Sequence, residues 1–317
     1  MAEIGKDIHR AKQLLEEGQL VAIPTETVYG LAANALNEKA VLEIFKAKNR
    51  PHFDPLIVHV ASLAQAEKLS STFPEKAKVL AQKFWPGPLT LLVTKKEAVP
   101  DIVTSGLNTV GLRCPDHALT LQLLQSLSFP LAAPSANPFG YVSPTTPQHV
   151  NEQLGDKVAY ILDGGECRVG IESTIIGFEN EQATVFRLGG LAIENLEPFT
   201  GPLQVQLHSS SNPHAPGQLQ SHYAPGKKII LGTQSQLQAH VHPNAGTIMF
   251  QNALSGIPAK RQIILSTSGD LEEAAQHLFA ALRTLDKTSI DIILAELVPD
   301  TGLGRAINDR LRRASAH

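Results

Sequence analysis

Apolar and polar positions repeat with both helical and strand periods along the chain, which predicts helices and strands mixed from the start. Near the N-terminus four apolar residues recur at helical spacing: Ile4, Ile8, Ala11 and Leu15. Asp7 is placed to cap the start of this helix and Gly18 to end it. Residues 20–24 then continue as a strand, so we expect the chain to open with a helix followed by a strand.

Similar patterns predict further elements up to residue 207. The expected helices cover residues 39–48, 74–84 and 117–127, and the expected strands cover residues 56–60, 89–94, 109–113, 131–133, 159–162, 173–177 and 183–187. The alternation is irregular, and turn residues interrupt it often. We therefore expect an α/β fold with a mixed twisted sheet flanked by helices, rather than a regular parallel barrel.

The pattern breaks at residues 208–226, where Ser, Pro, His, Gly and Gln dominate and no apolar period survives. We expect a linker there, between an N-terminal domain over residues 1–207 and a C-terminal domain over residues 227–317. The strands expected in the second domain cover residues 228–231, 247–250, 262–265 and 290–295, with a long helix over residues 270–285. This order predicts a small parallel α/β domain.

A last helix is expected over residues 303–313. It carries four arginines near its C-terminal end: Arg305, Arg310, Arg312 and Arg313. Positive charge at that end suits the helix dipole, so the arginines need no further role.

Composition narrows the class of protein. The 317 residues, 43% of them hydrophobic, are enough for two domains with substantial cores. Cys114 and Cys167 lie in no pattern with metal-ligand spacing, so neither a disulfide framework nor a structural metal site is expected. Without an apolar signal-peptide core or a stretch long enough to span a bilayer, the sequence predicts a soluble cytoplasmic protein that does not contact membranes. The net charge of −3 argues against stable direct binding of tRNA.

Polar side chains follow several predicted strands, and strand ends in α/β sheets commonly bind ligands. The string PTETVYG covers residues 24–30, although a polar turn closed by Gly30 is the alternative to a site. Lys48 and Arg50 stand at a helix end forced by Pro51, which would aim them outward to grip phosphates. Cations at a helix C-terminus also need no function.

Two further strands carry residues suited to binding. His59 interrupts an apolar strand, where a histidine is most often an ordinary core residue. Arg113 ends another strand, and it is expected at the same sheet edge as Thr27 if the two strands run alike. Such an arginine can bind a carboxylate through two hydrogen bonds, and a surface salt bridge is the alternative.

A rigid polar loop is expected at residues 133–138, APSANP, where two prolines fix the backbone around Ser135 and Asn137. Further polar residues stand at strand or loop ends: Ser143, Ser173 and Arg187. For Ser143, a helix cap near Thr146 is the alternative. The glycines after Arg187 permit close approach of a ligand.

No Walker A, GxGxxG, GxSxG or HExxH pattern occurs, so any phosphate site must be built differently. Taken together and in this order, the strings PTETVYGL, KxRP, PLIVHV, WPGPLT, VGLRCP, APSAN, ESTII and RLGG closely resemble the YrdC-like family of threonylcarbamoyl-AMP synthases. The strings HYAP and GLGRAINDRLRRAS resemble its long form, which carries an additional C-terminal domain. The resemblance implies a twisted α/β sheet around a concave, largely positive cavity, followed by a smaller Rossmann-like domain.

The resemblance also implies roles for individual residues. Those expected to contact L-threonine are Thr27, His59, Arg113 and Ser173, with Arg113 as the partner of the substrate carboxylate. Those expected at ATP are Lys48, Arg50, Asp54, Thr109, Ala133, Ser135, Asn137, Ser143, Arg187 and Tyr223. Lys48 and Arg50 are the expected catalytic cations. Asp54 stands where many relatives carry Asn, which leaves its role open.

The activity implied by the resemblance is the condensation of L-threonine, bicarbonate and ATP into threonylcarbamoyl-AMP and pyrophosphate, for threonylcarbamoyladenosine modification of tRNA. A tRNA threonylcarbamoyl-transferase machinery is the expected downstream partner. Mg²⁺ is expected to be held mainly by the ATP phosphates and water, because the sequence offers no dedicated metal cage.

Alternatives stay open for the linker and for the function. We expect residues 208–226 to act as a lid, with Tyr223 reaching over the site, and a plain spacer is the alternative. An RNA-binding or ribosome-maturation protein is a second functional interpretation, and a carbamoyl transferase acting on another substrate is a third.

Overall fold

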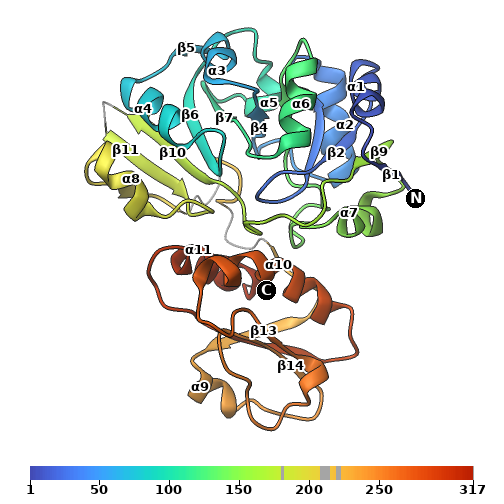
Figure 1. Cartoon of the computed structure of the whole chain (residues 1–317), viewed down its shortest axis with the longest axis vertical. Helices are drawn as coiled ribbons and strands as arrows, with labels where there is room; N and C mark the ends of the chain where they lie inside the picture. Colours follow the sequence, from blue (N-terminus) through green and yellow to red (C-terminus); the bar gives the residue numbers. More distant parts are fainter. Residues whose placement is uncertain (180–181, 208–214, 219–222, 317) are drawn as a thin grey trace.

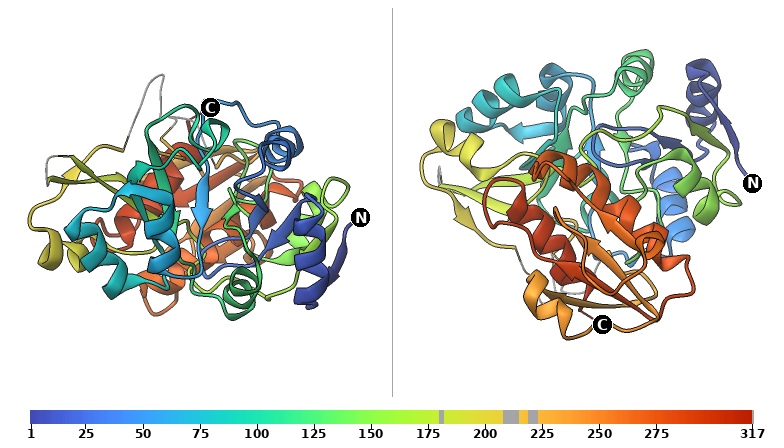
Figure 2. Two further views of the ribbon diagram at one scale, coloured as in Figure 1. Left: turned by 90° about the horizontal axis from the view of Figure 1, so that it is seen from above. Right: turned by 60° about the horizontal axis from the view of Figure 1, so that its bottom comes forward.

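The computed structural model describes residues 1–179, 182–207, 215–218 and 223–316. Figure 1 shows two α/β domains, with the C-terminal one in orange and red beneath the larger N-terminal one. Helices α10 (Leu271–Asp286) and α11 (Gly304–Ala314) lie between the C-terminal sheet and the N-terminal domain, as the further views in Figure 2 also show. The α/β class predicted from the hydrophobic pattern is confirmed.

Within the described residues, the N-terminal domain is built on a 12-stranded sheet with the order β1-β9-β2-β3-β8-β4-β7-β6-β10-β11-β12, to which β5 adds beside β6. Its strands are β1 (Glu3–Gly5), β2 (Val21–Ile23), β3 (Gly30–Asn34), β4 (Ile57–His59), β5 (Ser70–Thr72), β6 (Leu89–Lys95), β7 (Thr109–Arg113), β8 (Leu131–Ala132), β9 (Tyr160–Leu162), β10 (Thr174–Glu179), β11 (Gln182–Arg187) and β12 (Gln204–Val205). Its helices are α1 (Ile8–Glu16), α2 (Glu38–Lys48), α3 (Leu63–Leu69), α4 (Glu75–Phe84), α5 (Asp101–Thr104), α6 (Ala118–Ser126), α7 (Pro147–Leu154) and α8 (Ile193–Thr200). Parallel and antiparallel neighbours are mixed, so the predicted mixed sheet is confirmed.

The N-terminal segment agrees with its predicted caps but not with its predicted start. The Asp7 side chain accepts hydrogen bonds from the backbone N–H groups of His9 at 2.8 Å and Arg10 at 3.2 Å, which caps α1. Gly18 follows the helix with φ of +80°, a conformation that favours glycine. Ile4 lies in β1, which pairs with β9, and not in the helix. Its helical spacing misled because the cap at Asp7 already sets where the helix begins.

The C-terminal domain holds a 4-stranded sheet in the order β13-β16-β14-β15, and each neighbouring pair is parallel. Its elements are β13 (Lys228–Gly232), α9 (Gln234–Gln238), β14 (Ala245–Met249), η1 (Ala259–Arg261), β15 (Gln262–Ile264) and β16 (Ile292–Glu296), with α10 and α11. The predicted small parallel α/β domain is confirmed. No helix in the described part of the chain is long and apolar enough to cross a membrane.

The arginines of the last helix are not explained by the helix dipole alone. Arg310 is 0% exposed and Arg313 is 2% exposed. Arg310 forms an ion pair of 2.8 Å with Glu172 of the N-terminal domain, and Arg313 donates to the carbonyl oxygen of Leu207 at 2.9 Å. The expectation that these arginines need no further role is wrong, since docking of the two domains buries their charges.

The expected linker packs against the N-terminal domain where it is described. Residues 208–214 and 219–222 lie outside the described residues, whereas 215–218 and 223–226 lie within them. Ala215 packs in a cluster with Ile57 and Leu92. Gln218, which is fully buried, donates to the carbonyl oxygen of Gln206 at 3.0 Å. These residues of the linker are therefore a packed part of the fold, unlike a plain solvated spacer.

Candidate active site

Most of the candidate residues meet on one face of the N-terminal sheet. The pairing of β4 with β7 sets His59 opposite Arg113 and Ile57 opposite Gly111. Residues two apart on a strand share a face, so the side chains of Ile57, His59 and Arg113 project to the same side. A cavity of about 50 Å³ lies there, lined by Val28, Arg50, Ile57, His59, Arg113, Ala133, Pro134, Ser135, Glu172, Arg187, Pro216, Gly217 and Tyr223.

This placement corrects the expectation of a site at one sheet edge. β2 is antiparallel to β3, β3 to β8 and β8 to β4, whereas β4 and β7 are parallel. Strands β2 and β7 therefore run in opposite directions, and Arg113 does not share a strand-end edge with Thr27. Arg113 instead reaches the loop of residues 24–29 across the face of the sheet.

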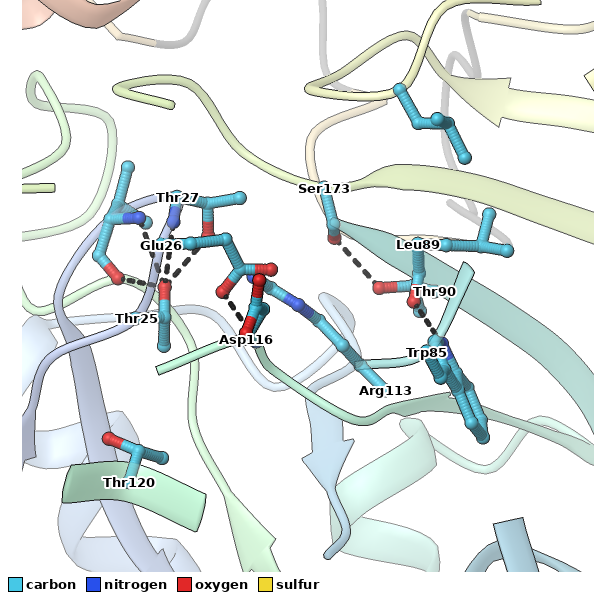
Figure 3. Close-up of polar contacts among 12 residues, drawn as sticks. Thr25, Glu26, Thr27, Trp85, Leu89, Thr90, Arg113, Asp116, Thr120 and Ser173 are labelled. Carbon is cyan, nitrogen blue, oxygen red and sulfur yellow. Dashed lines mark hydrogen bonds and ion pairs between the residues drawn. The ribbon is translucent and has the colours of Figure 1, made fainter. Parts of the chain in front are cut away.

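Arg113 meets a carboxylate that the sequence reading did not assign. Its Nη2 lies 2.8 Å from Oε1 of Glu26, and both side chains are at most 5% exposed. The second oxygen of Glu26 accepts from the backbone N–H of Asp116 at 3.1 Å, as Figure 3 shows. Nη2 of Arg113 and Oε1 of Glu26 are engaged with each other in this ion pair, whereas Nε of Arg113 has no partner among the described residues. Buried polar atoms are nearly always hydrogen-bonded, so this pair has donor capacity left for a ligand.

His59 lies beside Arg113 in the same wall. Burial, together with the charge of Arg113, lowers the pKa of His59 to about 3. Its imidazole is therefore neutral at physiological pH. Nδ1 of His59 is buried without a hydrogen-bond partner among the described residues. A neutral ring of this kind can accept or donate one hydrogen bond to a substrate without adding charge.

Arg50 and Asp54 form a buried ion pair at the next part of the wall. Nη2 of Arg50 lies 3.0 Å from Oδ2 of Asp54 and also donates to the carbonyl oxygen of Pro55 at 2.8 Å. Burial raises the pKa of Asp54, while the charges of Arg50 and Lys48 oppose that rise. The buried carboxyl group of Asp54 therefore has a cation next to it.

Lys48 is placed differently from the expectation that it projects outward. Helix α2 ends at Asn49, whose φ of 52° is left-handed, and Lys48 turns inward to be 1% exposed. Its Nζ donates to the carbonyl oxygen of Ser135 at 2.6 Å and to that of Asn137. Burial and the nearby Arg50 lower the pKa of Lys48. Lys48 therefore fixes the loop of residues 133–138 and does not line the cavity itself.

Arg187, the last residue of β11, brings another cation to the wall of the cavity. Arg187 donates through Nε to the carbonyl oxygen of Ser173 and through Nη2 to its Oγ, both at 3.0 Å. Oγ of Ser173 also shares a hydrogen bond of 2.7 Å with Oγ1 of Thr90, which Figure 3 shows. Ser143, fully buried, donates to Oε1 of Glu172 at 2.5 Å. Ser143 and Ser173 thus stand directly behind residues that line the cavity.

Three expected residues lie further from the cavity. Thr27 shares a hydrogen bond of 2.8 Å between its Oγ1 and that of Thr25, at the left of Figure 3, and only its neighbour Val28 lines the cavity. The Asn137 side chain donates to the carbonyl oxygen of Tyr141 at 2.8 Å. Thr109, at the opposite end of β7 from Arg113, lines a separate hollow of about 330 Å³. Thr109 therefore does not line the cavity that holds Arg113 and the other expected ligand-binding residues.

No group of three or more His, Cys, Asp or Glu side chains within the described ranges could hold a metal ion. The carboxylates at the cavity, Glu26, Asp54 and Glu172, each pair with an arginine instead. The arrangement suits the binding of anions by fixed cations, with any divalent cation carried mainly by the ligand.

Comparisons with known proteins cover almost the whole chain. A family model described as "Telomere recombination" matches residues 13–189, and one described as "Threonylcarbamoyl-AMP synthase, C-terminal domain" matches residues 191–316. The threonylcarbamoyl-AMP synthase of Pyrococcus abyssi is 42% identical, over 98% of this chain and 94% of its own. That of Bacillus subtilis is 40% identical, over 97% of this chain and 92% of its own.

The chain belongs to the threonylcarbamoyl-AMP synthase family. A solved structure of a family member, P. abyssi Sua5 complexed with L-threonine, superposes with a TM-score of 0.92 at 40% identity and covers 99% of this chain and 97% of that one. HypF, solved in a phosphate- and nucleotide-bound form, matches with a TM-score of 0.52 at 23% identity, which shows a shared fold only. The predicted long form of the family is confirmed.

Sequence reasoning missed Glu172, which lines the cavity, and Glu26, which pairs with the cavity residue Arg113. Both stand inside strings already singled out, PTETVYG and ESTII, next to Thr27 and Ser173. Their position beside predicted ligand contacts was the available signal. Pro216 and Gly217 were missed because their stretch of sequence carries no apolar period.

Proposed function

We propose that this chain catalyses the formation of threonylcarbamoyl-AMP and pyrophosphate from L-threonine, bicarbonate or CO₂, and ATP. The observation that supports it most directly is the convergence of Arg50, Arg113 and Arg187 on one buried cavity. The reaction brings together an amino-acid carboxylate, a carbamate and a triphosphate, all of which are anions. Three guanidinium groups suit such a set of ligands when they are held in place, Arg50 and Arg187 by buried hydrogen bonds and Arg113 by its ion pair with Glu26.

In the proposed reaction, the threonine amine attacks CO₂ and loses a proton to give a carbamate. A carbamate oxygen then attacks the α-phosphorus of ATP, and the bond to pyrophosphate breaks. The carbamate is already an anion, so this step needs no general base from the protein. Catalysis would rest on positioning two anions and offsetting their charge.

Roles for the residues follow from where they lie. Arg113 and the neutral His59 are proposed to hold threonine, with the carboxylate of threonine on the free donors of Arg113. Arg50 and Arg187 are proposed to hold the phosphates, with Asp54 keeping Arg50 in place. Lys48 is proposed to act through the loop it holds, which presents Ser135 and Ala133 to the nucleotide.

Bound Mg²⁺ would neutralise phosphate charge during the departure of pyrophosphate. The phosphates and water would supply most of its ligands, because the carboxylates beside Arg50 and Arg187, which are Asp54 and Glu172, are already paired with arginines. The chain's own residues orient the nucleotide and exclude water.

Residues 215–218 and 223 are proposed to close the site. Pro216 and Gly217 line the cavity, and the carbonyl oxygen of Pro216 accepts from Arg187 at 3.4 Å. Tyr223 completes the wall from a left-handed conformation with φ of 64°. These contacts support the interpretation of the linker as a lid. Sites for ligands of this size have volumes of about 300–1,000 Å³, so the 50 Å³ cavity would have to open.

The product is proposed to serve the threonylcarbamoyladenosine modification of tRNA, through a separate tRNA threonylcarbamoyl-transferase machinery, in the cytoplasm. The test is incubation with L-threonine, bicarbonate and Mg-ATP while pyrophosphate release is followed. Threonine-dependent release is expected, and none above a no-threonine control would refute the synthase function. Serine and carbamoyl phosphate in the same assay test the carbamoyl-transferase alternative, and a tRNA-binding assay tests the RNA-binding one.

A further inference from the structure

One residue of the C-terminal domain reaches the wall of the candidate active site. Arg310, on α11, is 0% exposed, and its Nε donates to Oε2 of Glu172 at 2.8 Å. Its Nη2 donates to the carbonyl oxygen of Leu188 at 2.8 Å, and its Nη1 donates to Oδ2 of Asp309 at 2.7 Å. All three guanidinium nitrogens are therefore engaged, two of them by residues of the other domain.

Glu172 connects this arginine to the cavity. It lines the cavity, and its two carboxylate oxygens are held from opposite sides, Oε1 by Ser143 at 2.5 Å and Oε2 by Arg310. The next residue, Ser173, accepts both hydrogen bonds from Arg187. The position of Glu172 thus sets where Ser143, Ser173 and Arg187 stand.

The charge of Glu172 needs compensation at this place. Burial alone would raise its pKa, but the charges of Arg310 and Arg187 lower it, so the group is a carboxylate. A bare carboxylate in the wall would repel anionic substrates and would draw Arg187 away from them. With Arg310 behind it, Arg187 stays available to the cavity.

Arg310 also contacts the residue that closes the cavity. Its guanidinium carbon lies 4.9 Å from the centroid of the Tyr223 ring, which stacks on Phe279 of α10 at 5.6 Å. Both contacts come from the C-terminal domain, and the hydroxyl end of Tyr223 points to Gly217.

We propose that Arg310 is a positioning residue of the active site: it holds Glu172 in the cavity wall and offsets its charge, so that the C-terminal domain completes the site. The proposal rests on the proposed function for its kinetic readout. The second domain would then contribute to substrate binding through Arg310, although Arg310 itself touches no substrate.

The test is a double-mutant cycle in the full-length protein with Arg310→Met and Glu172→Gln, with Lys287→Ala as control. Lys287 forms an exposed ion pair across the same domain boundary with Glu152, away from the cavity. We expect R310M to raise the KM for threonine and ATP about tenfold or more, because the loss of a charged hydrogen bond has about that effect. K287A should retain wild-type KM values.

In the E172Q background, loss of Arg310 should change both KM values by less than about threefold, because the carboxylate to be held and offset is gone. Wild-type KM values in R310M would overturn the proposal. So would a tenfold increase that persists unchanged in the E172Q background, since Arg310 would then act by another route.

Folding is checked by thermal unfolding of each variant. If R310M does not fold, Arg310→Lys replaces it. One ammonium cannot reproduce the bonds to Glu172, Leu188 and Asp309, so R310K should raise the KM values about threefold. Wild-type KM values in R310K would then mean a purely structural role and would overturn the proposal.

Failure of the proposed function is recognised separately, because wild-type protein would then release no threonine-dependent pyrophosphate. Hydrogen exchange of residues 172–174 and 223–226 gives a readout without turnover. Faster exchange in R310M or R310K than in K287A supports the positioning role. Equal exchange overturns it, whatever the activity of the wild type.

Discussion

Two groups of buried ionisable side chains differ in how fully their nitrogen and oxygen atoms are hydrogen-bonded within the chain. The cavity group consists of Asp54, His59, Arg113 and Glu26, the carboxylate partner of Arg113. Oδ1 of Asp54, Nδ1 of His59 and Nε of Arg113 are buried with neither a hydrogen bond nor an ion pair among the described residues. The interface group consists of Arg283, Arg310 and Arg313, whose guanidinium groups donate to carbonyl oxygens and carboxylates. Both groups are equally hidden from water.

This difference in hydrogen bonding indicates that the cavity group serves ligand binding and the interface group serves the packing of the two domains. An unsatisfied buried polar atom is costly unless a ligand supplies its partner, so the cavity group is arranged for something the chain itself does not provide. The interface group has all its partners within the chain, so it stabilises one arrangement of the two domains. Removal of a side chain from the first group should impair ligand binding, whereas removal from the second should impair folding or docking, and for Arg310 also binding, through its contact with Glu172.

The largest effect is expected for Arg113→Ala. The variant loses the proposed partner of the threonine carboxylate and leaves Glu26 as a buried carboxylate without a cation. The KM for threonine, measured by pyrophosphate release, should rise about 100-fold or more. Glu26→Gln controls for the carboxylate alone. Near-normal threonine affinity in R113A, with a normal unfolding curve, would contradict both the assignment and the comparison.

A smaller effect, on stability, is expected for Arg283→Met. Arg283 donates to the carbonyl oxygen of Ser143 at 3.2 Å, to that of Val142, and to Oε1 of Gln153 at 2.8 Å. Without it these acceptors stay buried and unbonded, which should lower the free energy of unfolding by about 2 kcal/mol. Denaturant titration measures this change.

The matched control for R283M is Lys287→Ala, directly after the same helix. The ion pair of Lys287 with Glu152 is exposed, so its loss should change the free energy of unfolding by less than about 1 kcal/mol. Equal effects of the two substitutions would remove the distinction between the interface group and ordinary surface charge.

The last effect concerns His59 and is spread over several pH units. The pKa of His59 is about 3 in the folded protein and about 6.5 in an unfolded chain, so below pH 6.5 the unfolded chain takes up a proton that the folded one does not. The free energy of unfolding should therefore fall as pH drops from 6.5 towards 3, by at most about 1.4 kcal/mol per pH unit from this group. His59→Asn should make the decline shallower by that amount. Urea titrations at pH 7, 6 and 5 test this, and parallel declines in both proteins would disprove the buried neutral state.

The sequence predicted best what local signals determine. The stop at Pro51 located the end of α2, and the prolines around Ser135 located the rigid loop. The ordered strings located Arg50, Arg113 and Arg187 correctly at one cavity. Each of these depends on a few neighbouring residues.

What the sequence did not predict depends on contacts between distant segments. Nothing near Arg310 indicates that Glu172, 138 residues away, is its partner. The shared face of His59 and Arg113 depends on the register of β4 against β7, which no periodicity encodes. Thr109 was misplaced for the same reason, since its position along β7 matters more than its membership of a motif.

The small cavity has a consequence for how affinities should be read. With Pro216, Gly217 and Tyr223 in its wall, the 50 Å³ space represents a conformation that binds no substrate of the proposed size. Any measured dissociation constant then equals the intrinsic one divided by the fraction of molecules that are open. A substitution in this wall that disfavours closure would therefore tighten apparent binding without adding a contact.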